Sequence, residues 1–346
     1  MIAALLISLL LLQAPVESPA AFDMDEYLYG HVMDAYDWHI TTIKDKHISI
    51  PLPVIVRSKT TGWHVFSSAK LAHGHEYEGF FIHHDAESHK DKIMEHTSAG
   101  DVRPLDISIT KNVAGLMFNS LVLVLLVLFG VRWYRKHDAR EEAPAGFSGL
   151  LEMLVMMVEN DIIKPCIGRD YKRYSPYLLT AFFFIFVNNL LGIVPFFPGG
   201  ANITGNIAVT FMMAMFTFLA VNLFGNKHYY KDIFWPDVPV FLKAIPLMPL
   251  IEIIGVFTKP FSLMVRLFAN ILAGHMMILG VVSVVFLTAE LGIAMNSGLS
   301  VIAVLFGVFM DILELLVAFL QAYIFTMLSS VFIGLSRQHP EQEKAE

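Results

Sequence analysis

Residues 259–287 read KPFSLMVRLFANILAGHMMILGVVSVVFL, an almost unbroken apolar run that contains Arg266. About 20 apolar residues suffice for a helix to cross a bilayer, so this run is long enough to span a membrane. An arginine at bilayer depth costs about 2.5 to 3.5 kcal/mol even on lenient insertion scales, and it usually faces protein or water. The stretch therefore predicts a membrane helix in which Arg266 marks an ion pathway.

The composition is that of a polytopic membrane protein. Of the 346 residues, 55% are hydrophobic and 16% are charged, and the mean hydropathy is +0.59, which is too apolar for an ordinary soluble domain. Cys166 is the only cysteine, which excludes an intramolecular disulfide and a zinc or iron–sulfur site built on cysteines. We expect no cofactor, no redox chemistry and no nucleic-acid partner.

The amino-terminal third differs from the rest of the chain. Residues 1–20 predict a secretory signal peptide, because an apolar run over residues 2–12 precedes small residues. The usual lysine or arginine before the run is missing, so a short anchor is the alternative. Residues 21–110 are polar and mixed, with strand-like runs such as residues 47–56 and a turn signal at residues 60–62. They predict a small domain outside the membrane.

Histidines are concentrated in this domain, which holds ten of the fourteen in the chain. Four of them are weak candidates for zinc or copper ligands: His73, His75, His83 and His84. Their spacing matches no specific metal pattern. Solvated surface histidines are therefore the preferred interpretation, and no metal site is predicted.

Residues 111–346 predict the membrane domain. Its expected spans cover about residues 115–131, 177–195, 207–224, 261–287 and 299–335. Arg132, Arg135 and Lys136 follow the first span, which places that end and the carboxyl-terminal tail in the cytoplasm and the amino-terminal domain outside it. Both final spans exceed the roughly 20 residues of a perpendicular crossing, so strong tilt is expected.

The expected fold is thus an all-α polytopic membrane protein with about five transmembrane helices, a long tilted C-terminal hairpin and a small N-terminal extracytoplasmic domain. Two helices are expected beside the spans. Residues 147–167 are apolar at near-helical spacing and predict a helix at the inner interface or against a partner. A shorter apolar helix at about residues 246–258 carries Glu252 on the cytoplasmic side.

Helix geometry groups the polar residues near Arg266. Asn270 falls within about 40° of Arg266 around the helix axis. The same face carries small residues: Ser262, Ala269 and Ala273. Small residues let another helix approach closely, which would bring a partner's side chain near the guanidinium. His275 points about 180° away and lies about 13 Å further along the axis, so it serves a different neighbour.

The last span carries Asp311, Glu314 and Gln321 on one stripe. Carboxyl groups at bilayer depth are costly, and with Glu252 on the cytoplasmic approach and Glu290 in the outer loop they indicate a wet proton or ion path. The alternative is an Arg266–Glu314 salt bridge that only fixes the helices.

Two further amides lie within the second span. Asn188 and Asn189 are candidates for lining a channel. An amide in a membrane helix more often hydrogen-bonds to a neighbouring helix, and that structural role is the preferred interpretation.

Three stretches resemble subunit a of the rotary F-type ATP synthase: residues 184–195 (FIFVNNLLGIVP), residues 259–275 and residues 314–325 (ELLVAFLQAYIF). The resemblance covers about residues 105–337. It implies that residues 111–346 form a membrane channel domain, the non-catalytic stator half of a proton channel. The implied partners are a ring of c subunits, peripheral-stalk b subunits, the remaining ATP synthase subunits and membrane lipid. The implied location is a bacterial inner membrane.

The resemblance also implies roles for the polar residues. Arg266 would face the c ring, keep the passing ring carboxylate deprotonated and block a proton leak between two offset half-channels. Arginine suits this because it keeps its charge at bilayer depth, whereas lysine loses its proton readily. Asn270 and Gln321 would line the interface near the arginine. His275 with Glu314 would hold the paired polar positions of one half-channel. Asp311 and Glu252 are further expected proton-translocation residues.

Two other function classes predict different patterns. A self-contained secondary transporter would show an inverted repeat of broken helices, and the two halves of this sequence show no clear repeat. An intramembrane hydrolase would need a nucleophile with a base on the spans, and the serines there lack that pattern. The coupling ion, H⁺ or Na⁺, and the size of the ring stay open.

Overall fold

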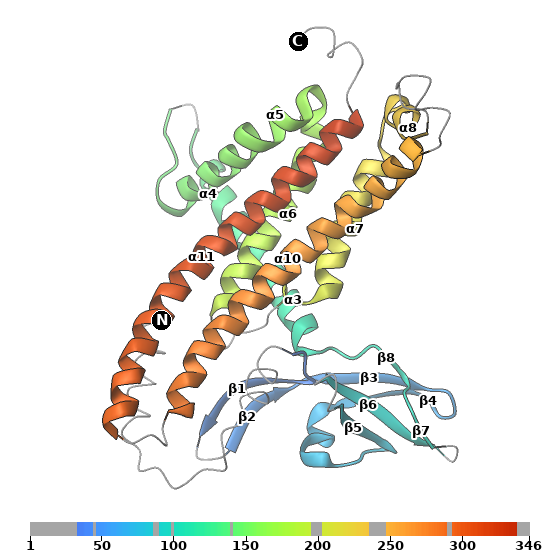
Figure 1. Ribbon diagram of the computed structural model, residues 1–346, viewed down its shortest axis with the longest axis vertical. Helices are drawn as coiled ribbons and strands as arrows, with labels where there is room; N and C mark the ends of the chain where they lie inside the picture. Colours follow the sequence, from blue (N-terminus) through green and yellow to red (C-terminus); the bar gives the residue numbers. More distant parts are fainter. Residues whose placement is uncertain are drawn as a thin grey trace. The chain divides into compact units, whose positions relative to one another are not determined.

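The computed structural model in Figure 1 describes residues 33–43, 46–85, 90–97, 100–138, 141–194, 203–234, 247–288 and 293–337. The expected signal peptide, residues 1–20, lies outside this part of the chain. The chain divides into two compact units. The first is formed by Met1–Met117, Leu191–Asn202 and Leu272–Leu316, and the second by Phe118–Leu190, Ile203–Ile271 and Val317–Glu346.

The amino-terminal part of the first unit is built from strands and two short 3-10 helices. The strands are β1 (Asp37–Ile43), β2 (Lys46–Pro51), β3 (Pro53–Ser58), β4 (Gly62–Ser67), β5 (Phe80–Asp85), β6 (Lys90–Thr97), β7 (Gly100–Val102) and β8 (Leu105–Asp106), and the 3-10 helices are η1 (Ser68–Lys70) and η2 (Ala72–Gly74). They form antiparallel sheets with the orders β1–β2, β4–β3–β8 and β5–β6–β7. Val54 and Val56 alternate inward along β3 and pack with Phe66, Phe80 and Ile93 as a small core.

The sequence predictions for this domain are partly confirmed. The strand expected at residues 47–56 is two strands, β2 and β3, which are separated at Leu52. Pro51 and Pro53 flank this residue. Because proline has no N–H to donate, the backbone hydrogen bonds of a single strand do not continue from β2 into β3. The turn expected at residues 60–62 is confirmed as the β3–β4 hairpin.

Helices form most of the remaining described chain: α3 (Lys111–Tyr134), α4 (Gly146–Met157), α5 (Lys164–Ile167), α6 (Tyr171–Ile193), α7 (Ile207–Leu223), α8 (Lys227–Phe234), α10 (Leu247–Leu287) and α11 (Ile293–Arg337). A π-helical turn, η3 (Val158–Ile163), and a 3-10 turn, η4 (Gly168–Asp170), complete the run from α4 to α6. The predominance of helix confirms the predicted helical class for this part of the chain.

Within the described residues, four segments are long and apolar enough to cross a membrane: Lys111–Tyr134, Gly146–Ile193, Leu250–Leu287 and Met295–Arg337. Helix α7 is also apolar but has only 17 residues, the lower end of the roughly 17 to 25 residues that span a bilayer. The chain is therefore a polytopic membrane protein. The helix expected at residues 147–167 is present as α4, η3 and α5, and Gly168, with φ at 73°, ends it before α6 begins.

The prediction of a separate helix at residues 246–258 is wrong. Helix α10 runs without interruption from Leu247 to Leu287 and contains Pro260. A proline inside a helix removes one backbone hydrogen bond, but membrane helices tolerate it where neighbouring groups satisfy the freed carbonyl. The apolar residues on both sides keep the rest of the ladder intact, so one helix carries both Glu252 and Arg266.

The core of the second unit lies between α6, α7, α10 and α11. Its fully buried side chains include Leu178, Phe182, Ile185, Leu267, Phe325 and Ile333. Backbones also approach closely in this unit, since a Cβ atom on Gly334 of α11 would collide with the carbonyl group of Cys166 in α5. Small residues at such crossings are characteristic of packing between membrane helices.

Arg337 ties the end of α11 to two other segments of the second unit. Its Nε donates a hydrogen bond to Oδ2 of Asp170 (3.0 Å), and its Nη2 forms an ion pair with the same carboxylate. Its Nη1 donates to the carbonyl oxygen of Phe224 (3.0 Å) and to Oδ1 of Asn226 (3.2 Å). The guanidinium thus holds the ends of η4, α7 and α11 together.

Candidate functional site

Arg266 lies on the face of α10 that points away from the protein core. The opposite face of the helix is buried, with Leu263, Leu267 and Ile271 at 2%, 0% and 8% exposure. These residues recur every fourth position and therefore form one stripe against the core. Arg266 itself is exposed. Packing of the apolar stripe thus fixes the direction in which the guanidinium points.

The residues predicted to share this face are exposed with Arg266. They are Ser262, Ala269, Asn270 and Ala273. In the part of the second unit that the structure describes, Arg266 makes no ion pair or hydrogen bond with another side chain. The exposed face of α10 therefore combines one cation with small side chains, as the helix geometry predicted.

Asn270 and Gln321 meet across two helices. Nδ2 of Asn270 donates a hydrogen bond to Oε1 of Gln321 at 2.9 Å. Gln321 is 2% exposed and lies on α11 beside the buried Ala318 and Ala322. This bond joins α10 to α11 one turn beyond Arg266 and holds the Asn270 amide in one orientation.

The two amides of α6 are bound within the helix bundle. Asn119 of α3 donates from Nδ2 to Oδ1 of Asn188 (3.0 Å), and Nδ2 of Asn189 donates to the carbonyl oxygen of Ala318 on α11 (3.2 Å). The hydroxyl of Thr204 donates to Oδ1 of Asn189 (2.7 Å). These bonds are of the helix-to-helix kind that the sequence favoured for both amides, and channel lining stays a prediction. Sequence reasoning missed Asn119 and Thr204, which carry no motif of their own.

A second polar group, here called the acid cluster, lies in the first unit and consists of Asp311 and Glu314 on α11, with His275 predicted to act with them from α10. Glu314 is 9% exposed, and its Oε2 atom is buried without a hydrogen-bond partner among the described residues. Its Oε1 atom lies 3.4 Å from the place that a Cβ atom would take on Gly274 of α10. Gly274 therefore leaves the room in which the Glu314 carboxyl group sits against the neighbouring helix.

His275 and Asp311 lie next to this contact in the sequence, His275 on α10 and Asp311 on α11. His275 directly follows Gly274, is half-buried and takes part in an interaction with its surroundings. Asp311 is half-buried and lies one turn before Glu314 on α11. A buried carboxyl group with an unpaired oxygen is costly as a carboxylate, so it is suited to hold and release a proton where water reaches it.

The remaining predicted residues lie elsewhere. Glu252 is exposed on α10 in the second unit, and Glu290 lies outside the described residues. His75 and His83 are exposed in the amino-terminal domain, and the side chains of His73 and His84 are outside the described part of the chain. No group of three or more His, Cys, Asp or Glu side chains among the described residues is placed to hold a metal ion.

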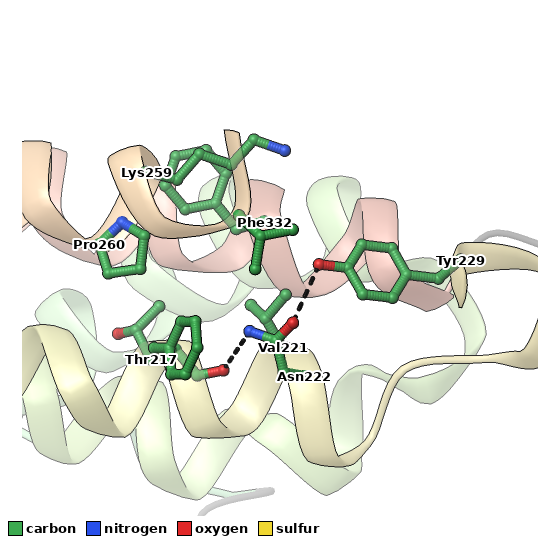
Figure 2. Close-up of a pocket in the computed structure, with 9 residues that line it drawn as sticks. Thr217, Val221, Asn222, Tyr229, Lys259, Pro260 and Phe332 are labelled. Atoms are coloured by element: carbon green, nitrogen blue, oxygen red, sulfur yellow. Dashed lines mark hydrogen bonds between the residues drawn. The ribbon is translucent and has the colours of Figure 1, made fainter. Parts of the chain in front are cut away.

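A small pocket in the second unit was not predicted from the sequence. Figure 2 shows it between α7, α8, α10 and α11. Tyr229 donates its hydroxyl hydrogen to Oδ1 of Asn222 (3.3 Å), and Asn222 donates to the carbonyl oxygen of Phe218 (2.9 Å). The Nζ atom of Lys259 lies 5.8 Å from the ring centroid of Phe332. The polar side chains of Asn222 and Tyr229 thus line the same pocket as Lys259 and Pro260 of α10.

Comparison with known proteins identifies the family. Residues 116–334 match the family model described as ATP synthase A chain. The chain belongs to the ATP synthase subunit a family. It is 40% identical to ATP synthase subunit a of Chloroherpeton thalassium, over 75% of this chain and 77% of the relative. It is 41% identical to the protein of that name from Pelodictyon phaeoclathratiforme, over 80% of this chain and 82% of the relative.

Another relative is ATP synthase subunit a 2 of Chlorobaculum tepidum, which is 36% identical over 84% of this chain and 82% of the relative. Residues 27–108 separately match a domain of unknown function. Members of the subunit a family are non-catalytic membrane subunits that serve proton transport in ATP synthesis, and this chain is therefore not a hydrolase. As a subunit, it works in a complex with other ATP synthase subunits.

Proposed function

We propose that this chain is the stator side of a proton path, in which Arg266 faces a rotating ring of c subunits and holds each passing ring carboxylate deprotonated. The observation that carries the proposal is the exposed guanidinium on a helix whose opposite face is buried. A cation in this position is expensive in a bilayer unless an anion of another chain faces it. The exposed small residues at positions 262, 269 and 273 leave room for such a partner helix.

The role of Arg266 follows from its permanent charge. A ring carboxyl group that approaches it in a medium of low dielectric constant is stabilised as the carboxylate, so it releases its proton into a half-channel before it passes. A proton cannot be carried past the fixed cation, so two half-channels on either side stay separated. Protons then cross only as the ring turns, and each one that descends 100 mV releases about 2.3 kcal/mol.

Asn270 and Gln321 support this arrangement. Their hydrogen bond of 2.9 Å fixes α10 against α11 beside the arginine. Asn270 remains exposed while Gln321 is buried. The pair therefore offers a polar surface next to the cation without requiring a second charge at that depth.

The acid cluster is proposed to load protons in one half-channel. Glu314 carries a buried oxygen without a partner among the described atoms, and Gly274 keeps space beside its carboxyl group. His275 and Asp311 would pass protons to and from Glu314. Glu252 is proposed to serve the cytoplasmic half-channel, and Glu290 the outer entrance.

The proposed topology follows the sequence. Residues 1–20 are a signal peptide, residues 21–110 are an extracytoplasmic domain and residues 111–346 form the channel domain with five spans. The cations Arg132, Arg135 and Lys136 at the end of α3 support a cytoplasmic end there. The membrane is the bacterial inner membrane, the long hairpin of α10 and α11 is tilted, and peripheral-stalk b subunits hold the chain in place.

Replacing the arginine tests the central role. The substitution Arg266→Ala is expected to abolish ATP-driven proton pumping in inverted membrane vesicles while the complex still assembles, because nothing then strips the proton from the ring carboxylate. Ser262→Ala on the same exposed face is the matched control and should pump normally. Normal coupled pumping by Arg266→Ala would remove the central claim.

Cross-linking tests the partner. Single cysteines introduced as Ser262→Cys or Ala273→Cys in a Cys166→Ser background should capture a small two-helix protein. Capture of contacts within this chain alone would favour a self-contained transporter.

A further inference from the structure

The sheet β4–β3–β8 is apolar on both faces. Its inner face carries the buried core residues Val54, Val56 and Phe66. Its outer face carries four large apolar side chains at high exposure: Trp63 (54%), Val65 (69%), Leu105 (57%) and Ile107 (53%). An antiparallel sheet with one face on a core usually turns polar side chains outward. The outer side of this sheet departs from that pattern.

The strand register makes these side chains one continuous surface. Arg57 on β3 lies opposite Trp63 on β4 and opposite Leu105 on β8. In the neighbouring row, Ile55 lies opposite Val65, and the N–H of Ile107 donates to the carbonyl oxygen of Ile55 at 3.0 Å. Side chains that face each other across strands lie about 5 Å apart.

We call this surface the outer apolar face; its members are Ile55, Arg57, Trp63, Val65, Leu105 and Ile107. Arg57 is its single charge, and its guanidinium carbon lies 5.5 Å from the centroid of the Trp63 ring. A contiguous exposed apolar surface indicates an interaction site, whereas single exposed apolar residues do not.

The other three-stranded sheet of the domain turns a polar face outward. On β5 and β6, His83 lies opposite Lys92. His96 forms ion pairs with Glu76 (3.0 Å) and Asp101 (2.5 Å). The ring of His96 also stacks on Phe81, with the ring centroids 4.3 Å apart, and covers that aromatic side chain. The domain is therefore two-sided, with one charged face and one apolar face.

The outer apolar face continues into the first membrane helix without a linker. Beyond β8, the N–H of Ile109 still donates to the carbonyl oxygen of Pro53 (3.1 Å), and α3 begins at Lys111, whose N–H donates to the carbonyl oxygen of Ala35 (2.8 Å). Ile107 is four residues before α3, so the chain places it within about 14 Å of the start of that helix. All of these residues belong to the first unit.

The exposed apolar surface also continues on the helix. Val113 and Met117, in the first two turns of α3, are 40% and 62% exposed. In Figure 1, β8 and β3 lie on the side of the domain from which α3 departs, and β5 lies on the far side. Exposed apolar side chains thus follow one another along the chain from the sheet into the first two turns of α3.

We propose that the outer apolar face lies on the lipid bilayer, in the headgroup region of the leaflet at which α3 begins. Tryptophan favours this depth because its ring is apolar and its N–H is polar. The Arg57 guanidinium would bind lipid phosphate, for which its planar set of donors is suited. Val65, Leu105 and Ile107 would contact the upper parts of the acyl chains. This proposal concerns the amino-terminal domain and stands apart from the proton path.

Lipid quenching of a site-specific label tests the contact. The full-length chain in its ATP synthase complex, with Cys166→Ser and Val65→Cys, is labelled with a fluorophore and reconstituted into vesicles of phosphatidylcholine and phosphatidylglycerol. The matched control is His83→Cys on the polar sheet. Acyl-brominated phosphatidylcholine should quench the Val65→Cys label several-fold more than the control label, and aqueous iodide should show the reverse order.

Two outcomes would overturn the proposal. Equal lipid quenching at both positions would mean that the face does not contact the bilayer. Protection of the Val65→Cys label from both quenchers would mean that protein covers the face, whether a second copy, another subunit or another segment of this chain. Leu105→Cys, on β8 at the other edge of the same sheet, repeats the test should the first variant fail to assemble, and the same order of quenching is expected.

Discussion

Replacing Glu314 by glutamine is the sharpest test of the acid cluster. The substitution keeps the shape of the side chain and removes its ability to bind and release a proton. The Oε2 atom of Glu314 already lacks a hydrogen-bond partner among the described residues. The change in stability should therefore stay within about 1 kcal/mol, the net value of one hydrogen bond.

The expected loss of transport is much larger. Without a group that binds the proton at this depth, the ion must pass as a charge, which costs about 2.5 to 3.5 kcal/mol. Since about 1.4 kcal/mol corresponds to a factor of ten, proton flux through Glu314→Gln should fall about 100-fold. The assay is ATP-driven acidification of inverted vesicles, followed with a pH-sensitive dye, together with gel analysis of the assembled complex.

A matched control on the same helix is Thr326→Val. The Oγ1 atom of Thr326 is also buried without a partner in the described part of the chain, but it does not titrate. This variant should pump at the normal rate. If Glu314→Gln assembles and pumps as fast as Thr326→Val, Glu314 carries no protons and the proposed relay is wrong.

Two further predictions concern stability. Arg337→Met should lower the free energy of unfolding by about 2 kcal/mol, because a charge-assisted hydrogen bond to Asp170 is lost. The unfolding temperature of the purified protein should fall, and an unchanged temperature would contradict the proposed role of Arg337. Hydrogen bonds to Asp101 and Glu76 raise the pKa of His96. A raised folded-state pKa adds stability below the unfolded value of about 6.5, and this stability is lost as pH rises through the folded pKa. Amide hydrogen exchange in β6 should therefore become faster as pH rises through the folded-state pKa of His96. The substitution His96→Gln should abolish this pH dependence.

Local sequence patterns predicted the direction of side chains but not their partners. The helical period placed Arg266 with Asn270 and small residues on one face, and the structure confirms that this face is exposed. The length of the apolar runs also predicted helices at the spans, because apolar runs of this length form helices in a membrane. The bond between Asn270 and Gln321, 51 positions apart, depends on which helices pack together. No local pattern contains that information.

The errors have equally specific causes. Separate helices were predicted at residues 246–258 and 261–287, yet α10 continues through Pro260 because one missing hydrogen bond is a small loss in a long apolar helix. The contact between Gly274 and Glu314 was not predicted, since a glycine in an apolar run shows no partner in the sequence. In the amino-terminal domain, strand-like runs were recognised, but the apolar outer face of β4–β3–β8 depends on a register that only pairing reveals.

Pro260 has a mechanical consequence for α10. Because proline has no N–H, the carbonyl oxygen of Val256, four residues earlier, has no helical donor to bind. Val256 and Pro260 both line the pocket of Figure 2, where polar side chains gather. The helix can therefore change its curvature at this turn without breaking a hydrogen bond. Strain at the Glu252 end of α10 can therefore be taken up at this turn and need not displace Arg266.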